Sequence, residues 1–466
     1  MNDTKQKTPM GGVIAPGKQR SYNEIVELLD ANWESNAETS CIKRLDQALE
    51  NPSKKLDSVL IAGTNGKSLT AHFTTKLLRE EGISVGAFYA PHILTYNERI
   101  AFNGETISNK TFTEIANDVI NTAASEGLKP NSFELLTMMA LLYFAQNKVD
   151  VALLEVSEQY ADVLKVCAPK IAAVTRITPD KAGTTADKIK QALDVAHPGT
   201  WVVSADQSKL NLQTMLEVAT SKGAQWAMPI RKLAPLNYPF EQLHGRCAAL
   251  AERIAYIYVN QVAHKDTVIV SGSLLTKPKA QRGRPTLEAK RQAELNPQKT
   301  LEQFWKEDHG TLPARFQIMD KEKPTVMLDK ADNLDAIENL LLGVRLLHYQ
   351  RPLKGLTVVL GGNNPDIDMD ELLKALRYFF KKTSGQVIVC PADVQPGQSG
   401  TTSWDVEKVT NDLRSMKIKA TASASFKEAF ETAKNSVDDR HGLIVVTGSA
   451  SVITKYWQDH KGMKKL

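Results

Sequence analysis

The chain has 466 residues, of which 42% are hydrophobic and 24% charged, a balance typical of globular proteins that predicts two or three domains. Its net charge of +5 permits an anionic ligand but does not indicate a nucleic-acid-binding protein. The polar first residues lack the apolar run of a secretory signal, and no apolar stretch approaches the roughly 20 residues that span a bilayer. Because the four cysteines lie far apart without a CxxC pair, we expect reduced thiols in a cytoplasmic protein that has no membrane partner.

Strands and helices alternate through the first two thirds of the chain, after a polar segment at residues 1–19 that we expect to be a flexible tail. A short apolar run at 58–62 predicts a buried strand, and residues 67–81 carry apolar side chains at helical spacing. Further strands are expected at 85–89, 151–156, 171–174 and 201–203, with a strongly apolar helix at 133–146. The alternation predicts an α/β fold, with a mostly parallel sheet and helices on both of its faces.

A basic stretch at 277–292 separates this region from a second one, and its prolines and glycine indicate a loop. We interpret this stretch as a solvated surface insertion, with a loop that contacts phosphate or RNA as the alternative. Strand–helix alternation then restarts, with strands expected at 325–328, 356–360, 387–390 and 443–446. This pattern predicts a second, Rossmann-like domain that lacks a GxGxxG sequence.

The segment Gly63-Thr64-Asn65-Gly66-Lys67-Ser68 lies between a predicted strand and a predicted helix, the setting of an anion-binding loop. Backbone N–H groups of such a turn face the phosphates, and Lys67 adds a point charge. Gly63 and Gly66 allow backbone angles and close approaches that a side chain would prevent. Ser68 is placed to reach a phosphate or its Mg²⁺ ion. The general P-loop pattern has a further glycine where this chain has Ile61, so the match to that pattern is incomplete.

Seven short blocks, in order, resemble the folylpolyglutamate synthase and dihydrofolate synthase branch of the Mur ligases. The Gly-Thr-Asn-Gly-Lys loop is the Mur-ligase form of the phosphate loop, and Pro313-Ala314-Arg315-Phe316 is similar to a Pro-Gly-Arg-Phe block of the family. Asp329-Lys330-Ala331-Asp332-Asn333 stands where the family has Asp-Gly-Ala-His-Asn. The blocks lie at 62–67, 91–100, 133–137, 154–156, 313–316, 329–333 and 447–449. The resemblance covers about residues 21–458.

This resemblance implies a P-loop ATPase domain of the Mur-ligase type at 20–308 and a C-terminal Rossmann-like ligase domain at 309–466. It also implies ATP and Mg²⁺ as cofactors, and a folate-like carboxylate and glutamate as substrates. In the family, ATP phosphorylates the carboxylate, and an amine then attacks the acyl phosphate, a reaction of one-carbon metabolism. Such chemistry needs positive charge around the transferred phosphoryl group.

The residues that the resemblance marks as functional fall into four groups. The expected catalytic residues are Lys67, Glu155 and Lys181. The expected nucleotide-binding residues are Gly63, Thr64, Asn65, Gly66, Lys67, Ser68, Arg315, Asp329 and Asn333. The expected substrate residues are His92 and Arg99, and the expected metal ligands are Glu155 and Ser68.

Several family positions carry other residues in this chain. Tyr89 replaces a serine that binds magnesium, and Lys181 replaces a histidine that does so. Leu193 stands at the position of a carbamylated lysine, Cys247 replaces an asparagine that contacts ATP, and Asp332 replaces the histidine of Asp-Gly-Ala-His-Asn. An ammonium cannot bind Mg²⁺, so Lys181 would place its charge on the phosphates instead, and the ion would be weakly held or absent.

Three interpretations therefore remain open. The chain is an active ATP-dependent ligase of the folylpolyglutamate synthase type, or a nucleotide-binding pseudo-ligase with a regulatory or assembly role. The third is a partner of nucleic acid that uses the basic 277–292 stretch. ATP turnover separates the first two, and a steep salt dependence of RNA binding would favour the third.

Overall fold

A computed structural model describes residues 17–33, 41–156, 164–179, 183–234, 236, 240–265, 301, 304–305, 312–394 and 402–463. Lys181, the basic stretch at 277–292 and most of the predicted tail lie outside these ranges. Within them, no helix combines the length and the apolar character that crossing a membrane requires.

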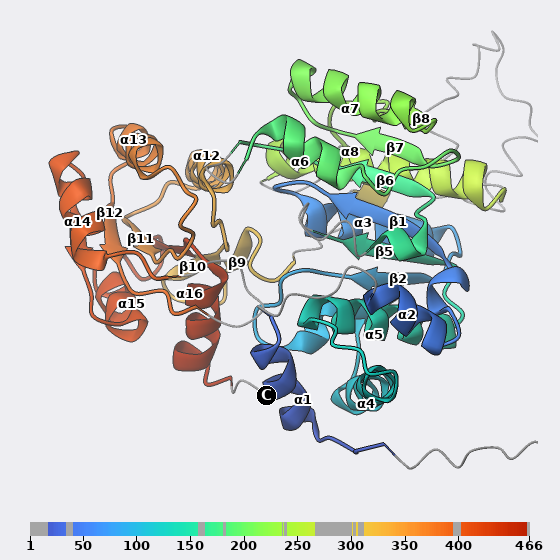
Figure 1. Ribbon diagram of the computed structural model, residues 1–466. Coiled ribbons are helices and arrows are strands. Elements are labelled where there is room, and N and C mark those ends of the chain that lie inside the picture. Colours follow the sequence, from blue (N-terminus) through green and yellow to red (C-terminus); the bar gives the residue numbers. More distant parts are fainter. Residues whose placement is uncertain are drawn as a thin grey trace, which may run out of the picture.

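Two sheets organise the described chain, and the first is an eight-stranded sheet with the order β4-β3-β2-β5-β1-β6-β7-β8 (Figure 1). Parallel pairing joins its strands, except that β3 runs antiparallel to both β2 and β4. The strands are β1 (Asp57–Ala62), β2 (Val85–Phe88), β3 (Ile100–Phe102), β4 (Glu105–Thr106), β5 (Val151–Glu155), β6 (Ile171–Val174), β7 (Trp201–Ser204) and β8 (Gln225–Ala227).

Helices cover both faces of this sheet because alternate residues of its strands point in opposite directions. Leu60 and Ala62 of β1 pack with α1 (Tyr22–Ala31), α2 (Cys41–Ala48), α4 (Asn109–Ser125), α5 (Ser132–Gln146), α6 (Thr185–Ala192) and α7 (Lys209–Ser221). Val59 and Ile61 face the other way, toward α3 (Lys67–Glu80) and α8 (Glu241–Ile257). We refer to this sheet and its helices as the eight-stranded unit.

The second sheet has the order β13-β12-β11-β14-β10-β9, and only β9 is antiparallel to its neighbour among these six strands. Its strands are β9 (Gln317–Met319), β10 (Thr325–Leu328), β11 (Leu356–Leu360), β12 (Gln386–Val389), β13 (Ala420–Ala422) and β14 (Leu443–Thr447). One face packs on α12 (Leu334–Gln350), α13 (Met369–Phe380) and α14 (Val406–Ser415). The other packs on α15 (Phe426–Lys434) and α16 (Ala450–Lys455), and together these elements form the six-stranded unit.

The predicted fold class is confirmed, since both sheets are mostly parallel and carry helices on both faces. The strands and helices that the sequence predicts are present, and their predicted and observed ends differ by no more than one residue. The short strands β3, β4, β8, β9 and β13 were not predicted, because two or three residues carry too little periodicity to detect. The predicted domain boundary at residue 308 stays a prediction, because residues 306–311 lie outside the described ranges.

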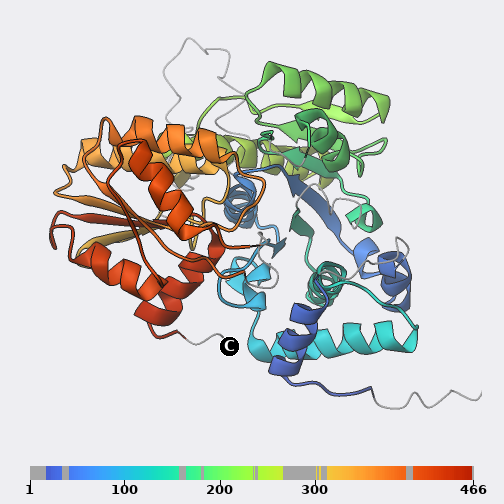
Figure 2. The ribbon, with the colours of Figure 1, turned by 60° about the vertical axis from the view of Figure 1, so that its left-hand side comes forward.

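The two units lie side by side in both views, and one loop of the eight-stranded unit is built into the other (Figures 1 and 2). Ile93, in the loop after β2, is 4% exposed and packs within the apolar cluster of the six-stranded unit that includes Val446 and Ile453. Its carbonyl oxygen accepts a hydrogen bond of 2.6 Å from Oγ1 of Thr454 in α16. The carboxylate of Glu98 holds the loop in shape by accepting bonds from the N–H groups of Ile93, Leu94 and Thr95.

We expect Ile93→Ala to weaken the contact between the units, because it removes apolar side chain from a packed core at a cost of about 2–5 kcal/mol. Differential scanning calorimetry should then show a lower melting temperature for the six-stranded unit. Ile230→Ala is the matched control, because Ile230 is 44% exposed and should tolerate the same change. Equal melting temperatures for the wild type and both variants would show that Ile93 does not join the units.

Candidate active site

The position of the phosphate loop follows from the pairing of β1 with two parallel neighbours. In the register of the sheet, Ile61 of β1 lies opposite Glu155 of β5, and Ala62 lies opposite Val174 of β6. The loop that leaves β1 therefore emerges between the carboxyl ends of β5 and β6, where ligands bind in open α/β sheets. Glu155 is the last residue of β5, and Thr175 directly follows the end of β6.

Both glycines of the loop occupy places that no side chain could share. Gly63 has φ of 129°, and a Cβ atom there would lie 2.2 Å from Oγ1 of Thr175. Gly66 has φ of 88°, and a Cβ atom there would lie 2.9 Å from Sγ of Cys247. The Thr175 hydroxyl donates to the carbonyl of Asn65 at 2.7 Å, so the close approach also holds the loop. Positive φ and close contacts both require glycine here.

Lys67 and Ser68 begin helix α3, whose first turn has no side-chain cap. The ammonium of Lys67 donates to the carbonyls of Gly63 at 2.5 Å and Thr64 at 3.2 Å. The Ser68 hydroxyl donates to Oε1 of Glu155 at 2.9 Å. Free N–H groups at the start of a helix, together with a lysine, make a site for phosphate groups.

Glu155 is the natural candidate for a metal ligand, because its carboxylate is 1% exposed. Its second oxygen, Oε2, is buried and has no hydrogen-bond partner among the described residues. A buried carboxylate oxygen without a partner is costly unless a cation or a donor occupies the adjacent space. Mg²⁺ is commonly held by one or two carboxylates, waters and substrate phosphates, so Glu155 and Ser68 fit a divalent ion that shares its ligands with a nucleotide. No cluster of three or more acidic, histidine or cysteine side chains that could hold an ion without such help occurs in the described ranges.

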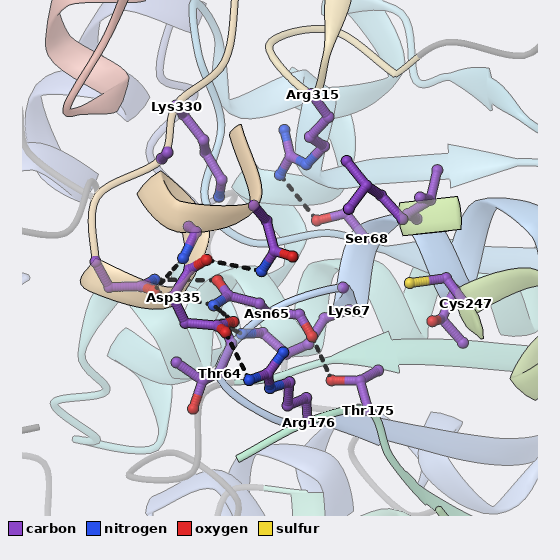
Figure 3. Close-up of a pocket in the computed structure, with 18 of the residues that line it drawn as sticks. Thr64, Asn65, Lys67, Ser68, Thr175, Arg176, Cys247, Arg315, Lys330 and Asp335 are labelled. Carbon is purple, nitrogen blue, oxygen red and sulfur yellow. Dashed lines mark hydrogen bonds and ion pairs between the residues drawn. The ribbon is translucent and has the colours of Figure 1, made fainter. Parts of the chain in front are cut away.

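The six-stranded unit presents Arg315 to the same place. One guanidinium nitrogen of Arg315 donates to Oγ of Ser68 at 2.8 Å (Figure 3). The residues on either side, Ala314 and Phe316, have φ of 55° and 47°, a left-handed conformation that costs energy in residues other than glycine. Strain on both sides of one arginine indicates that its position matters for function.

Asp329 stabilises the turn that contains Arg315. Its two carboxylate oxygens accept bonds from the N–H groups of Phe316 at 2.8 Å and Ala331 at 2.9 Å. Burial raises the pKa of Asp329 to about 6, although these bonds and Arg315 favour the charged form. Asp329 thus shapes the Arg315 turn from the end of β10.

Direct polar contacts join the phosphate loop to the start of α12. The amide nitrogen of Asn65 donates to Oδ1 of Asn333 at 2.9 Å and to Oδ2 of Asp335 at 2.7 Å. Asp335 also forms an ion pair of 2.9 Å with Arg176, which follows β6. Asn333 caps α12 by accepting from the N–H of Ala336 at 3.0 Å. These contacts form a latch between the two units, and Figure 3 shows Asn65, Arg176 and Asp335 gathered below Arg315.

The groups described above line a cavity of about 410 Å³ between the two units, within the range of small-molecule sites. One part of its wall is charged, and another is apolar, with Leu243, Leu250, Phe316 and Ala336. His244 joins the apolar part, where its ring meets Phe316 edge to face at 5.0 Å. Burial lowers the pKa of His244 to about 4, so its imidazole is neutral at pH 7. The cavity can therefore take a ligand that is anionic at one end and planar and apolar at the other.

Most of the residues predicted to be functional meet in this cavity. Those that line it are Thr64, Asn65, Gly66, Lys67, Ser68, Glu155, Arg315, Asp329 and Asn333, and Gly63 lies at the entry of the loop. His92 and Arg99 do not line it: they are buried together, with Nε of Arg99 donating to Nδ1 of His92 at 2.9 Å. Their predicted role in binding substrate stays a prediction, as does that of Lys181, which lies outside the described residues.

Positions that depart from the family pattern also differ in where they lie. Tyr89 lies near Glu155 but interacts with Thr75 and does not line the cavity, and burial raises the pKa of its phenol. Cys247 does line it, and burial raises the pKa of its thiol to about 11, so the thiol is neutral. Asp332 lines it too, and accepts a bond of 3.0 Å from Asn333.

Sequence reasoning missed a set of charged residues that line the cavity. They are Arg176, Lys188, Arg246, Lys330 and Asp335. Arg176 could have been found, because it follows a predicted strand at the edge of the sheet where the loop lies. Lys188 and Arg246 carry no such signal, because charged residues on helices usually face water.

Comparison with known proteins gives one consistent result, although no family model matches the chain. The dihydrofolate synthase/folylpolyglutamate synthase of Bacillus subtilis is 32% identical over 221 residues, 45% of this chain and 48% of that protein. The mitochondrial folylpolyglutamate synthase of Bos taurus is 27% identical over 69% of this chain and 57% of its own length. The match thus spans about half of these two relatives. The folylpolyglutamate synthase of Lacticaseibacillus casei is 25% identical over 88% of this chain and 91% of its own length.

Solved structures agree with these relatives in fold. Mycobacterium tuberculosis folylpolyglutamate synthase, complexed with ADP, superposes with a TM-score of 0.73 at 20% identity, over 95% of this chain and 98% of that one. The bifunctional folylpolyglutamate synthase/dihydrofolate synthase of Yersinia pestis, complexed with AMPPNP and Mn, gives 0.70 at 20% identity, over 96% and 100%. At such identity the likeness establishes the arrangement of both units.

The latch leads to a prediction about how the two units approach each other. Asp335→Asn keeps the shape of the side chain but removes the ion pair between Asp335, which is 9% exposed, and Arg176, which is 39% exposed, at a cost of about 1 kcal/mol. We expect the nucleotide-free protein to open slightly, which small-angle X-ray scattering would detect as a larger radius of gyration. Asp370→Asn, at an exposed position on α13, is the matched control. An unchanged radius in the Asp335 variant would mean that the latch does not hold the units.

Proposed function

We propose that this chain is a member of the folylpolyglutamate synthase and dihydrofolate synthase family, and that it is an ATP-dependent ligase that joins glutamate to a folate-like carboxylate. One observation carries the proposal: Lys67 and Glu155 of the eight-stranded unit and Arg315 of the six-stranded unit line a single cavity. Such a convergence of cations and a buried carboxylate suits the transfer of a phosphoryl group, in which catalysis is mostly positioning and charge stabilisation.

The reaction would proceed in two steps. A carboxylate oxygen of the acceptor attacks the terminal phosphorus of ATP, the bond to the bridging oxygen breaks, and ADP leaves with that electron pair. The amine of glutamate then attacks the acyl carbon, inorganic phosphate leaves, and the nitrogen loses a proton as the amide forms. Lys67, Arg315 and the first N–H groups of α3 would stabilise the charge on the phosphoryl oxygens in the first step.

A divalent ion, which we expect to be Mg²⁺, would be held by Glu155 and Ser68 together with the phosphates. When bound, it would neutralise charge that develops between the terminal phosphates. Support comes from the unpartnered oxygen of Glu155 and from the Mn ion in the Yersinia pestis relative. Arg315, which donates to Ser68 in this structure, would contact the phosphates of a bound nucleotide.

The neutral, apolar part of the cavity wall would take the adenine base. The folate-like acceptor would bind where the loop carrying His92 and Arg99 leaves β2, since Ala90 and Pro91 of that loop line the cavity. We place this activity in the cytoplasm and in one-carbon metabolism. The four cysteines, all free thiols, accord with that compartment.

Lys67→Ala should weaken ATP binding by tenfold or more, about 1.4 kcal/mol at least, because it removes the cation carried by the phosphate loop. Isothermal titration calorimetry on the folded variant measures this change. Lys190→Ala, at an exposed position of α6, is the control and should bind ATP like the wild type. If Lys67→Ala kept full affinity, the phosphate loop would not be the nucleotide site.

The ligase activity itself is tested by incubating the protein with ATP, glutamate, a reduced folate and Mg²⁺, and by measuring phosphate release and product mass. We expect a product heavier by one glutamyl residue and phosphate release that needs all components. ATP binding without any glutamylated product, over a range of folates and of Mg²⁺ and Mn²⁺ concentrations, would instead support the pseudo-ligase. The replacements at Tyr89 and Asp332 make that comparison necessary.

A further inference from the structure

Lys330 lies where the resembling family block has glycine, and its side chain enters the cavity from the six-stranded unit. It follows Asp329 at the end of β10, and its backbone N–H donates to the carbonyl of Ala314 at 3.0 Å, which ties it to the Arg315 turn. Figure 3 shows Lys330 and Arg315 extending toward the phosphate loop from the same side. Lys330 therefore faces Lys67 across the cavity that both of them line.

The cavity holds more positive than negative side chains. Six cationic residues line it: Lys67, Arg176, Lys188, Arg246, Arg315 and Lys330. Four carboxylates do so, and all four already accept bonds: Asp329 from two backbone groups, Asp335 from Asn65 and Arg176, Glu155 from Ser68, and Asp332 from Asn333. The excess positive charge would favour an anionic ligand.

Within the described ranges, the ammonium of Lys330 has neither an ion-pair partner nor a hydrogen-bond acceptor, and only burial and more distant charges act on it. Burial lowers its pKa to about 7, and so do Arg315 and Lys67, while Asp332 and Glu155 compensate only in part. A charged group in this position is poorly stabilised by the protein itself, since desolvation is not offset by a paired acid. An anion bound beside Lys330 would supply the negative partner that the protein does not provide.

We propose that Lys330 binds the terminal phosphates of the nucleotide from the side opposite Lys67, a site that rests on the proposed function. The two lysines then enclose the polyphosphate from different units, so its binding also draws the units together. Because Lys330 brings positive charge close to Glu155, it takes over part of the work of the divalent ion. This makes affinity depend on the number of phosphates, and makes it less dependent on metal than with glycine at this position.

The test compares the affinities of ATP, ADP and AMP for the wild type, Lys330→Met and Lys330→Gly, each with Mg²⁺ and with excess EDTA. Loss of a charged hydrogen bond should weaken ATP binding by about tenfold or more, and leave AMP binding within about twofold. In Lys330→Gly, adding EDTA should reduce the affinity for ATP by a larger factor than in the wild type. Lys321→Met, at an exposed position between β9 and β10, is the matched control. Glutamate and a folate, titrated alone, show whether Lys330 serves the carboxylate substrates instead.

A second measurement uses the unchanged protein, in case a variant does not fold. Acetic anhydride near neutral pH labels lysines that carry little positive charge, and mass spectrometry reports the labelling of each one. ATP should protect Lys330 by about tenfold, and AMP should not, while labelling of Lys321 stays constant in both cases.

The outcomes separate this inference from the function on which it rests. If the wild type binds ATP and Lys67→Ala does not, but Lys330→Met binds ATP with full affinity, only the role of Lys330 is wrong. If ATP and AMP lose affinity equally in Lys330→Met, or folate protects Lys330 while ATP does not, the phosphate assignment is wrong. If the wild type binds no ATP at all, the proposed function and this inference both fail.

Discussion

The parallel pairing of β1 with β5 and β6 is the constraint on which the site depends. Parallel strands end at the same edge of a sheet, so the phosphate loop, Glu155 and Thr175 meet although they are distant in the chain. Thr175 then lies so close that residue 63 must be glycine, and Glu155 becomes a buried carboxylate beside Ser68. The chemistry of the site therefore follows from the order of the strands.

Apolar packing and polar bonds both hold the contact between the two units. Ile93 anchors one side of it by apolar packing, whereas the cavity side is held by polar bonds of Asn65 and Asp335. Polar contacts near water are individually weak, and the cavity wall they surround carries excess positive charge. The cationic side chains of the cavity wall repel one another, and a bound polyphosphate would attract all of them. Under the proposed function, binding of the nucleotide would therefore also draw the two units together.

Replacements relative to the family pattern gain meaning from their places in the fold. Tyr89 interacts with Thr75 and does not line the cavity, so it does not take the place of the magnesium-binding serine that the resemblance implies. Lys330 and Asp332 both line the cavity, and they alter its charge directly. The wall of the cavity still carries more cationic than acidic side chains. That excess accords with the proposed binding of phosphate groups.

The sequence alone predicted the α/β class and the phosphate loop, because strand periodicity and glycine spacing are local signals. The resemblance to the family added Glu155, Arg315, Asp329 and Asn333, and the structure brings them to the same cavity as the loop. The sequence could not show that His92 and Arg99 pack against each other, or that Tyr89 turns away, because side-chain direction depends on neighbours distant in the chain. Only the tertiary structure brought Arg176 to Asp335 and placed Lys330 opposite Lys67. In both pairs, one residue belongs to the eight-stranded unit and the other to the six-stranded unit. No local sequence pattern predicts how close such residues lie, because they approach each other only after both units have folded.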